Sequence, residues 1–106
     1  MKRQLFEILI PTRFNNGKLI EVEYHKKWDE WICNRCGGLT ILRETRNGIW
    51  SNDGKNQREE MLPVRVACNE ILDIEEILHF TMMFYHQKSI MAYQISDNVI
   101  IRNKSD

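Results

Sequence analysis

The sequence predicts one α+β domain whose elements follow the order β-α-β-β-α-β. A short apolar run over residues 5–10 precedes an amphipathic stretch over 20–36. Two strand-like runs follow, and a second amphipathic stretch over 74–89 leads into a final strand-like run. Apolar residues recur every second position in strands and every third or fourth in helices, which separates the two kinds of run. The order is typical of ferredoxin-like domains, so we expect a four-stranded antiparallel sheet with two helices on one face.

The first strand and the first helix have clear apolar patterns. The strand over 5–10 has one apolar face and one mixed face, which carries Glu7. Residues 15–17 read Asn-Asn-Gly and predict a loop. Apolar residues at helical spacing predict that a helix over 20–36 packs on the sheet. The strand's apolar face consists of Phe6, Ile8 and Ile10, and the helical stripe consists of Ile20, Tyr24, Trp28, Trp31 and Ile32.

The middle of the chain predicts two strands and two turns. Residues 39–45 and 61–68 are rich in strand-forming side chains. Asn47-Gly48 is a favoured tight-turn pair because both residues tolerate positive φ, and residues 52–54 give a second turn signal. Pro63 lacks a backbone donor, so we expect it at a sheet edge or at a bulge.

The second helix has apolar residues on more than one side. It would begin at a D-x-x-E capping motif over 73–76, or one turn earlier with Asn69 as the cap, and run to about residue 88. Phe80 and Met83 point away from its main stripe, and Phe84 lies at the margin. Contiguous exposed apolar surface usually marks a partner site, so we expect these three residues to form an interface between copies of the chain. The chain then ends in one bent strand or a small hairpin over 90–102.

Size and charge narrow the class of protein. The chain has 106 residues, the size of one domain, and we expect a short disordered tail over 103–106. Its 15 basic and 15 acidic residues give a net charge of zero, which argues against a nucleic-acid partner. No apolar run approaches the roughly 20 residues of a membrane span, and no signal-peptide pattern follows Met1. Three cysteines, an odd number, fit reduced thiols, so we expect a cytoplasmic protein.

Chemically active side chains form only weak motifs. Cys33-Asn34-Arg35-Cys36 has the C-x-x-C spacing of a redox pair or of half a zinc site. The motif comes at the end of a helix, where the dipole disfavours a thiolate, and there is no second C-x-x-C. We therefore expect structural cysteines, with no metal and no cofactor. His79 and His86 lie two turns apart on the second helix, and we expect them, like His25, at the surface.

Four short motifs carry a resemblance to a known family. They are Gly38-Leu39-Thr40, Gly48-Ile49-Trp50, Arg58-Glu59 and Gln87-Lys88-Ser89-Ile90. Their order resembles that of a family of small bacterial ferredoxin-like domains of unknown function with G-L-T, G-x-W, R-E and Q-x-S-V motifs. The resemblance covers residues 6–95. Many members carry an export signal, which this chain lacks. The resemblance supplies no catalytic residues and implies that Thr40, Trp50, Arg58, Glu59 and Gln87 cluster, either structurally or around a ligand pocket.

Two function classes follow from these patterns. The first is a homo-oligomer, most simply a dimer, that binds a small ligand or a protein partner without catalysis, with a second copy covering the open sheet face. The second is a small cofactor-free enzyme of the dimeric α+β-barrel type, in which a His or Glu serves as general base. The lack of a strong catalytic motif favours the first. A structural interaction protein without a pocket is a third alternative.

Overall fold

The computed structural model describes the backbone of residues 3–36, 39–41, 46–52, 55–68 and 71–100, together with Arg102 and Lys104. Side chains are described over the same residues except 39–59 and 71–72. The tail that we expect to be disordered, residues 103–106, therefore falls largely outside the described residues.

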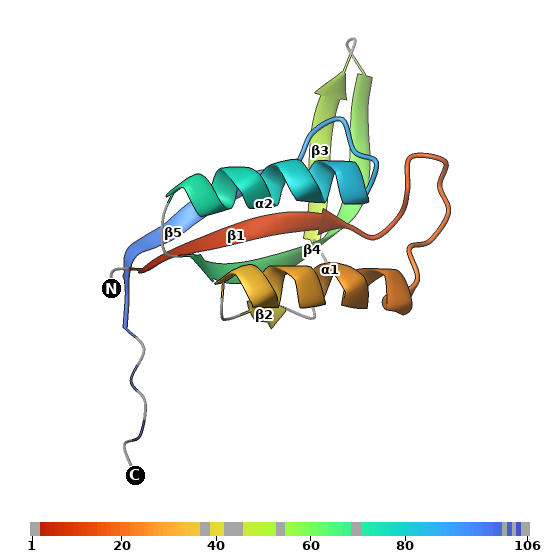
Figure 1. Cartoon of the computed structure of the whole chain (residues 1–106). Coiled ribbons are helices and arrows are strands. Elements are labelled where there is room, and N and C mark those ends of the chain that lie inside the picture. Colours follow the sequence, from red (N-terminus) through yellow and green to blue (C-terminus); the bar gives the residue numbers. More distant parts are fainter. Residues whose placement is uncertain are drawn as a thin grey trace.

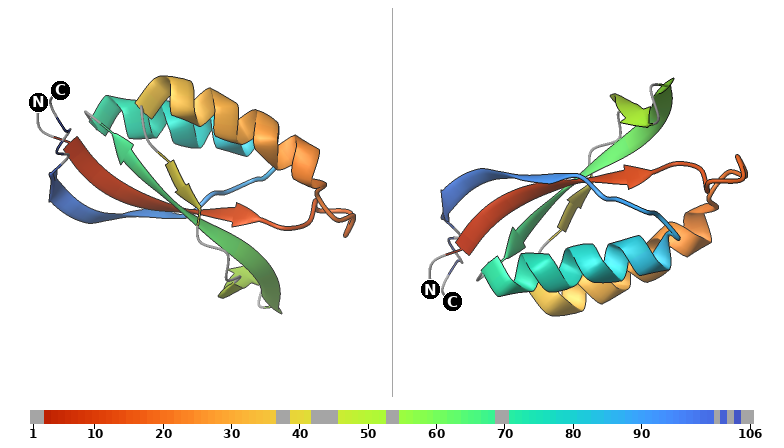
Figure 2. Two further views of the ribbon diagram at one scale, coloured as in Figure 1. Left: turned by 90° about the horizontal axis from the view of Figure 1, so that it is seen from below. Right: turned by 90° about the horizontal axis from the view of Figure 1, so that it is seen from above.

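The elements combine one antiparallel sheet with two helices. Both helices cover the same face of the sheet (Figure 1, Figure 2). The strand order is β2-β4-β1-β5, and β3 also pairs with β4. This arrangement confirms the predicted ferredoxin-like α+β fold. The elements are β1 (Arg3–Pro11), α1 (Val22–Cys36), β2 (Leu39–Ile41), β3 (Arg46–Asn52), β4 (Lys55–Cys68), α2 (Ile71–Phe84) and β5 (Ala92–Val99).

The sheet differs from the prediction in its number of strands. We expected four, and the described part of the chain has five, because two separate segments, β2 and β3, take the place of one strand beside β4. β2 pairs with residues 64–66 of β4, and β3 pairs with residues 55–61. The β3–β4 hairpin extends beyond the helix layer (Figure 1).

The predicted tight turn at Asn47-Gly48 is wrong, because both residues lie within β3 and pair with β4. β4 has 14 residues and is long enough to pair with the whole of β3. This ladder outweighs the local preference of Asn-Gly for a turn. The second turn signal, at 52–54, fits the strand ends, since Asn52 pairs with Lys55. The two residues between them lie outside the described part of the chain.

Pro63 lies in the interior strand β4, opposite Leu9 of β1. The N–H of Leu9 donates to the carbonyl of Met91 at 3.0 Å, on the far side of β1, so Leu9 and Pro63 form a non-hydrogen-bonded pair. The nitrogen of Pro63 therefore faces the other neighbour of β4. On that side β2 ends opposite Val64 and β3 begins opposite Met61, and no described strand pairs with residue 63. The edge prediction is wrong for β4 as a whole, but the missing donor does fall at a break between two partners.

The main core lies between the sheet and the helices. The predicted apolar face of β1 is buried there, as are Trp28 and Ile32 of the predicted stripe on α1. Two-residue and helical periodicity therefore identified the core correctly on these elements. The buried cluster comprises Phe6, Ile8, Ile10, Ile20, Trp28, Ile32, Cys36, Val64, Val66, Cys68, Ile74, Ile77 and Tyr85.

α2 ends at Phe84, before the predicted end near residue 88. His86 has a φ of +54°; its N–H donates to the carbonyl of Met83 at 3.3 Å, and the N–H of Gln87 donates to that of Met82 at 2.9 Å. These two bonds form a Schellman motif, which ends a helix with one residue in the left-handed conformation. Glycine usually takes that position, so a histidine there left the helix end unmarked in the sequence.

The last strand is a single bent strand, one of the two predicted alternatives. β5 pairs with β1, and the register shifts on both sides of Leu5 mark a bulge. The polar residues 96–98 therefore continue the strand instead of ending it.

Candidate functional site

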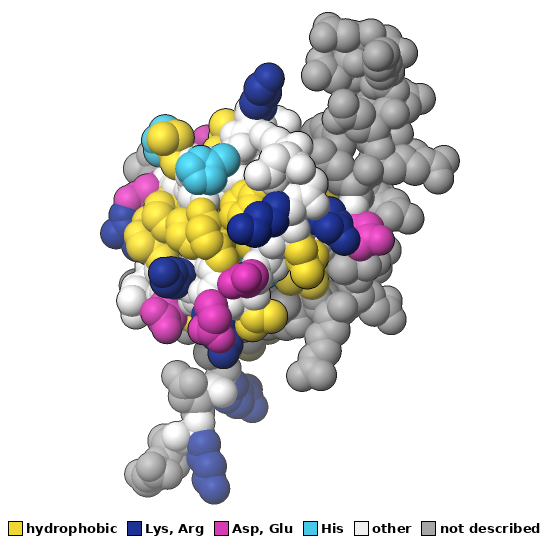
Figure 3. All heavy atoms as spheres, turned by 90° about the vertical axis from the view of Figure 1, so that its right-hand side faces the viewer, with side chains coloured by type: hydrophobic (Ala, Val, Ile, Leu, Met, Phe, Trp, Pro, Cys, Tyr) yellow, Lys and Arg dark blue, Asp and Glu magenta, His cyan; other side chains and the backbone are white. Residues whose placement is uncertain are grey.

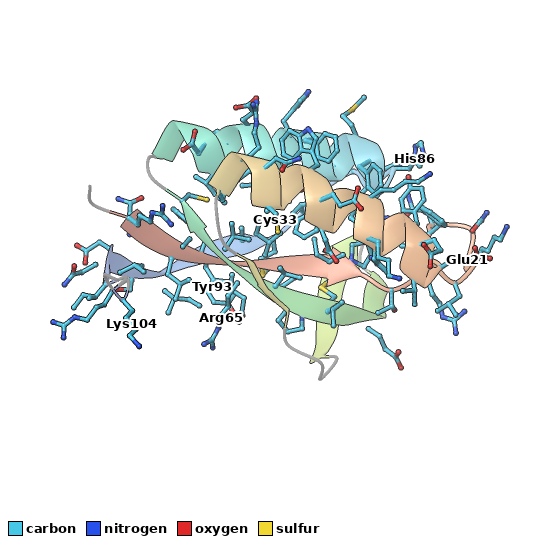
Figure 4. The ribbon with its side chains drawn as sticks, turned by 60° about the horizontal axis from the view of Figure 1, so that its bottom comes forward. Glu21, Cys33, Arg65, His86, Tyr93 and Lys104 are labelled. Carbon is cyan, nitrogen blue, oxygen red and sulfur yellow. The ribbon has the colours of Figure 1, made fainter. Side chains whose placement is uncertain are left out.

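The predicted interface residues of α2 lie in two different surroundings. Phe80 stacks on Trp31 of α1, with ring centroids 3.8 Å apart, and the ring of Phe84 lies 4.2 Å from that of Tyr24. The predicted outward position of Phe80 is wrong, because the two helices lie side by side (Figure 4), whereas the half-buried Phe84 fits its predicted place at the margin. Met83 remains 66% exposed, as predicted. A role of these residues in self-association stays a prediction.

Half-buried aromatic rings continue along the seam between the helices. Phe14 contacts Tyr24 edge-on at 5.2 Å, Phe84 lies 5.5 Å from Phe80, and Arg35 lies 5.0 Å from the ring of Trp31. Apolar side chains reach the surface at the end of the molecule shown in Figure 3, where charged side chains surround them. This seam holds α1 on α2 and leaves only parts of its rings in contact with solvent.

Polar bonds also join the helices. The indole N–H of Trp28 donates to Thr81 Oγ1 at 2.9 Å, and the Thr81 hydroxyl donates to the carbonyl of Ile77 at 2.6 Å. The Tyr24 hydroxyl donates to the carbonyl of Phe84. Trp28 and Thr81 are buried, and a buried donor without an acceptor is costly, so this bond fixes how the helices pair.

His25 is a member of the same seam, although we expected it at the surface. Its Nδ1 lies 2.7 Å from the hydroxyl of Tyr85, and both residues are withdrawn from solvent. Burial lowers the pKa of His25 and, together with the Asp29 charge, raises the pKa of Tyr85 well above its ordinary value. Both shifts favour a neutral pair in which Tyr85 donates to His25. The position of His25 three residues before Trp28 was the signal that could have revealed it.

The five predicted ligand-binding residues are divided between distant positions. Thr40 stands opposite Arg65 in the register of β4, whereas Trp50, Arg58 and Glu59 belong to the β3–β4 hairpin. Six residues of extended strand separate position 65 from position 59, which is roughly 20 Å. The side chains of these four residues lie outside the described part of the chain, so their role in ligand binding stays a prediction.

Gln87, the fifth predicted ligand-binding residue, follows the end of α2. Its side-chain Nε2–H donates to the carbonyl of Tyr85 at 3.0 Å, and the side chain is half-buried. This bond supports the turn after α2. The side chains of the other four predicted ligand-binding residues are not among those described. Whether they cluster with Gln87 therefore stays a prediction.

The sheet face away from the helices is largely apolar. Along the paired stretch of β1 and β4, eight residues alternate toward this face, and only Glu7 and Arg65 among them are charged. An antiparallel sheet that faces water on one side normally carries polar residues there. Three of its six apolar residues are buried within the chain, and the other three, Leu5, Leu9 and Ala67, are half-buried and remain available to a partner. The six are Leu5, Leu9, Pro11, Met61, Pro63 and Ala67.

The two charged residues of this face form an ion pair near its centre. Glu7 is only 4% exposed, and Arg65 Nε lies 3.3 Å from its Oε1. Tyr93 of β5 stands opposite Glu7 in the register, and Figure 4 shows Arg65 and Tyr93 on the side of the sheet away from the helices. Sequence reasoning treated Glu7 only as an interruption of an apolar run. The pairing register with Arg65, which the sequence alone did not establish, is what gives it a partner.

The described residues meet neither the requirements of a metal site nor those of a membrane-spanning helix. No three His, Cys, Asp or Glu side chains among them gather as a metal site would require. None of the described helices is long and apolar enough to cross a membrane.

Comparisons with known proteins identify the fold. No protein-family model and no curated protein matches the chain. It is similar to the structure of the divalent cation tolerance protein CutA1 from Thermus thermophilus, with a TM-score of 0.62 and 11% identity over 92% of this chain and 87% of that one. CutA1 from Oryza sativa gives a TM-score of 0.64 and 8% identity, over 99% and 84% of the two chains. At these identities the likeness concerns the fold alone: this chain has the ferredoxin-like architecture seen in the CutA1 structures.

Proposed function

We propose that this chain is a homo-oligomeric module that acts by binding, and that a second copy covers the sheet face away from the helices. The observation that supports the proposal is the composition of that face: six of its eight residues in the paired stretch of β1 and β4 are apolar, and three of these, Leu5, Leu9 and Ala67, are only half-buried within the chain. Burying apolar surface is the dominant favourable term in protein association. Contact with a partner surface that is itself apolar therefore gives the most favourable free energy of association for such a face.

A second copy fits the face better than a charged partner does. Glu7 and Arg65 neutralise one another, and the whole chain has a formal net charge of zero, so two copies of this face do not repel one another. The most common closed assembly uses the same surface on both copies, which requires such a self-compatible face. The β3–β4 hairpin and the helices lie on opposite sides of the sheet (Figure 2), so the hairpin would contact the second copy as well.

The ligand part of the proposal also depends on assembly. Thr40 pairs opposite Arg65, which is roughly 20 Å along β4 from Glu59, and this separation favours a site that draws on two copies. A second copy on the sheet face would place a hairpin beside the strands of its partner, with Trp50, Arg58 and Glu59 on it. We propose that a small-molecule ligand binds at this junction, without catalysis. The divalent cation tolerance named for the Thermus thermophilus protein does not extend to this chain, because 11% identity supports the fold alone.

The mass of the protein in solution tests the assembly. We expect native mass spectrometry and light scattering to give a multiple of the 12.7 kDa chain mass. Leu9→Lys would place a charge in desolvated surface and weaken association by about 3 kcal/mol or more, which is roughly 100-fold in Kd. Met83→Lys is the matched control, because Met83 is exposed on the helix layer, and we expect it to leave the mass unchanged.

Two results would decide against this assembly. A wild-type chain that stays monomeric at high micromolar concentration would contradict it outright. Dissociation by Met83→Lys, with Leu9→Lys unaffected, would move the interface to the helix layer. In that case the interface predicted from Phe80, Met83 and Phe84 would be the correct one.

A further inference from the structure

Two buried thiols lie in contact at one end of the molecule. Cys36 is the last residue of α1 and Cys68 is the last residue of β4, and their sulfur atoms are 3.2 Å apart. Both side chains are buried in the core, whereas Cys33, one helical turn before Cys36, is exposed. The C-x-x-C spacing thus pairs an exposed thiol with a buried one, and the buried one touches a third cysteine 32 residues further along the chain.

We propose that Cys36 and Cys68 form a reversible disulfide, and that exposed Cys33 is the thiol that first reacts with the oxidant, a small disulfide such as oxidised glutathione. The bond would connect the end of α1 directly to the end of β4. It would therefore fix the first helix on the sheet.

The distance between the sulfur atoms favours a direct bond over a shared metal ion. A disulfide bond is about 2.05 Å long, so the two sulfur atoms need to approach by roughly 1.2 Å. Two thiolates on a tetrahedral zinc ion with bonds of about 2.3 Å lie roughly 3.8 Å apart, so metal binding would require these atoms to separate. No third metal-ligating side chain joins them among the described residues.

The electrostatics of the pair make Cys36 the better nucleophile. The hydrogen bond from Cys68 lowers the pKa of Cys36, and Arg3 and Arg35 act in the same direction against burial and Asp73. The same hydrogen bond, with burial, raises the pKa of Cys68. The thiolate is the reactive form in exchange, so Cys36 reacts before Cys68.

Three exchange steps complete the route. The Cys33 thiolate attacks the small disulfide, which forms a mixed disulfide on Cys33 and releases one small thiolate. The Cys36 thiolate then attacks the Cys33 sulfur, which forms a Cys33–Cys36 bond and releases the second small thiolate. Cys68 no longer donates to a thiolate at this stage, so it loses its proton more easily. Its thiolate attacks the Cys36 sulfur, forms the Cys36–Cys68 bond and returns Cys33 as a thiol. The protein loses two protons and two electrons, and the small disulfide becomes two thiols.

Peptide mapping of the oxidised full-length protein tests the bond. The wild-type chain is incubated with oxidised glutathione and a chelator, the free thiols are alkylated, and the digest is analysed by mass spectrometry without reduction. We expect a Cys36–Cys68 link and an alkylated Cys33, both reversed by dithiothreitol. Closing a loop of this length should raise Tm by roughly 10 °C.

Variants test the route. In Cys33→Ser the same bond should form roughly 10-fold more slowly or worse, since the buried thiols then meet the oxidant only when the fold opens. Asn34→Ser, an exposed neighbour on α1, should keep the wild-type rate. An equal rate in Cys33→Ser would overturn the role of Cys33. A stable glutathione adduct, a final Cys33–Cys36 bond or three free thiols after incubation would overturn the disulfide itself.

Discussion

The two faces of the same sheet present contrasting environments within a single strand. Ile8 is fully buried under the helices, whereas its neighbour Leu9 lies on the face that no described helix covers. The first face is sealed by a core cluster and by bonds between α1 and α2. The second face is nearly as apolar along β1 and β4, but no described helix covers it, it has an ion pair at its centre, and three of its apolar residues are only half-buried. Apolar composition alone therefore does not show which face of a sheet is covered by the helices of the same chain.

Alanine substitutions at these two neighbours give the largest contrast. Ile8→Ala removes buried methyl groups from a closed core and should lower the free energy of unfolding by about 2–5 kcal/mol. Leu9→Ala, in protein dilute enough to be monomeric, should cost at most about 1.5 kcal/mol, because the site is only half-buried. Urea denaturation with an unchanged m-value measures both. Equal losses in dilute protein would show that Leu9 is covered by its own chain.

The bond between the helices should have an intermediate effect. Thr81→Val keeps the side-chain shape but leaves the indole N–H of Trp28 without its acceptor, which should cost about 1–3 kcal/mol. Thr81→Ser keeps the hydroxyl that accepts from Trp28 and is the matched control for loss of this hydrogen bond. A double-mutant cycle with Trp28→Phe should show coupling between the two positions. Additive losses would mean that shape, not this bond, holds the helices together.

Lowering the pH should reduce the stability of the fold through His25, by less than the alanine substitutions or the Thr81 substitution do. Burial lowers the pKa of His25 in the fold below its unfolded value of 6.5, so the unfolded chain takes up the proton first. Stability should therefore be full above pH 6.5 and decline as the pH falls below it. His25→Gln retains an acceptor for Tyr85 without titrating, and its Tm should fall less between about pH 7.5 and about pH 5.5. His79→Gln, at an exposed site on α2, is the control for replacing a histidine outside the seam.

Much of the fold could be predicted because, in the long strands and helices, the regular spacing of apolar residues matches the side chains that are buried. Alternation in β1 and the helical stripe of α1 follow directly from which side chains meet the core. The errors fall where tertiary structure overrides a local preference. The long ladder of β4 takes Asn47-Gly48 into a strand, and a histidine in a glycine position ends α2 early.

Less of the candidate site could be predicted, because it depends on register and on helix contact. Glu7 meets Arg65 only through the pairing of β1 with β4. The rings of Phe80 and Phe84 are covered only because α1 lies beside α2, which a helical projection of one element does not reveal. The contact between Cys36 and Cys68 joins residues 32 apart in the chain, beyond the reach of motif spacing.

The proline opposite Leu9 has a consequence for aggregation between misfolded chains. In a chain that opens locally, Pro63, which is buried in the folded protein, would meet an invading extended segment at a point where β4 has no described partner on one side. Pro63 offers that invader no N–H, so cross-β stacking cannot continue through this point. The missing donor thus opposes amyloid-like growth at a point where an interior strand lacks a described neighbour on one side.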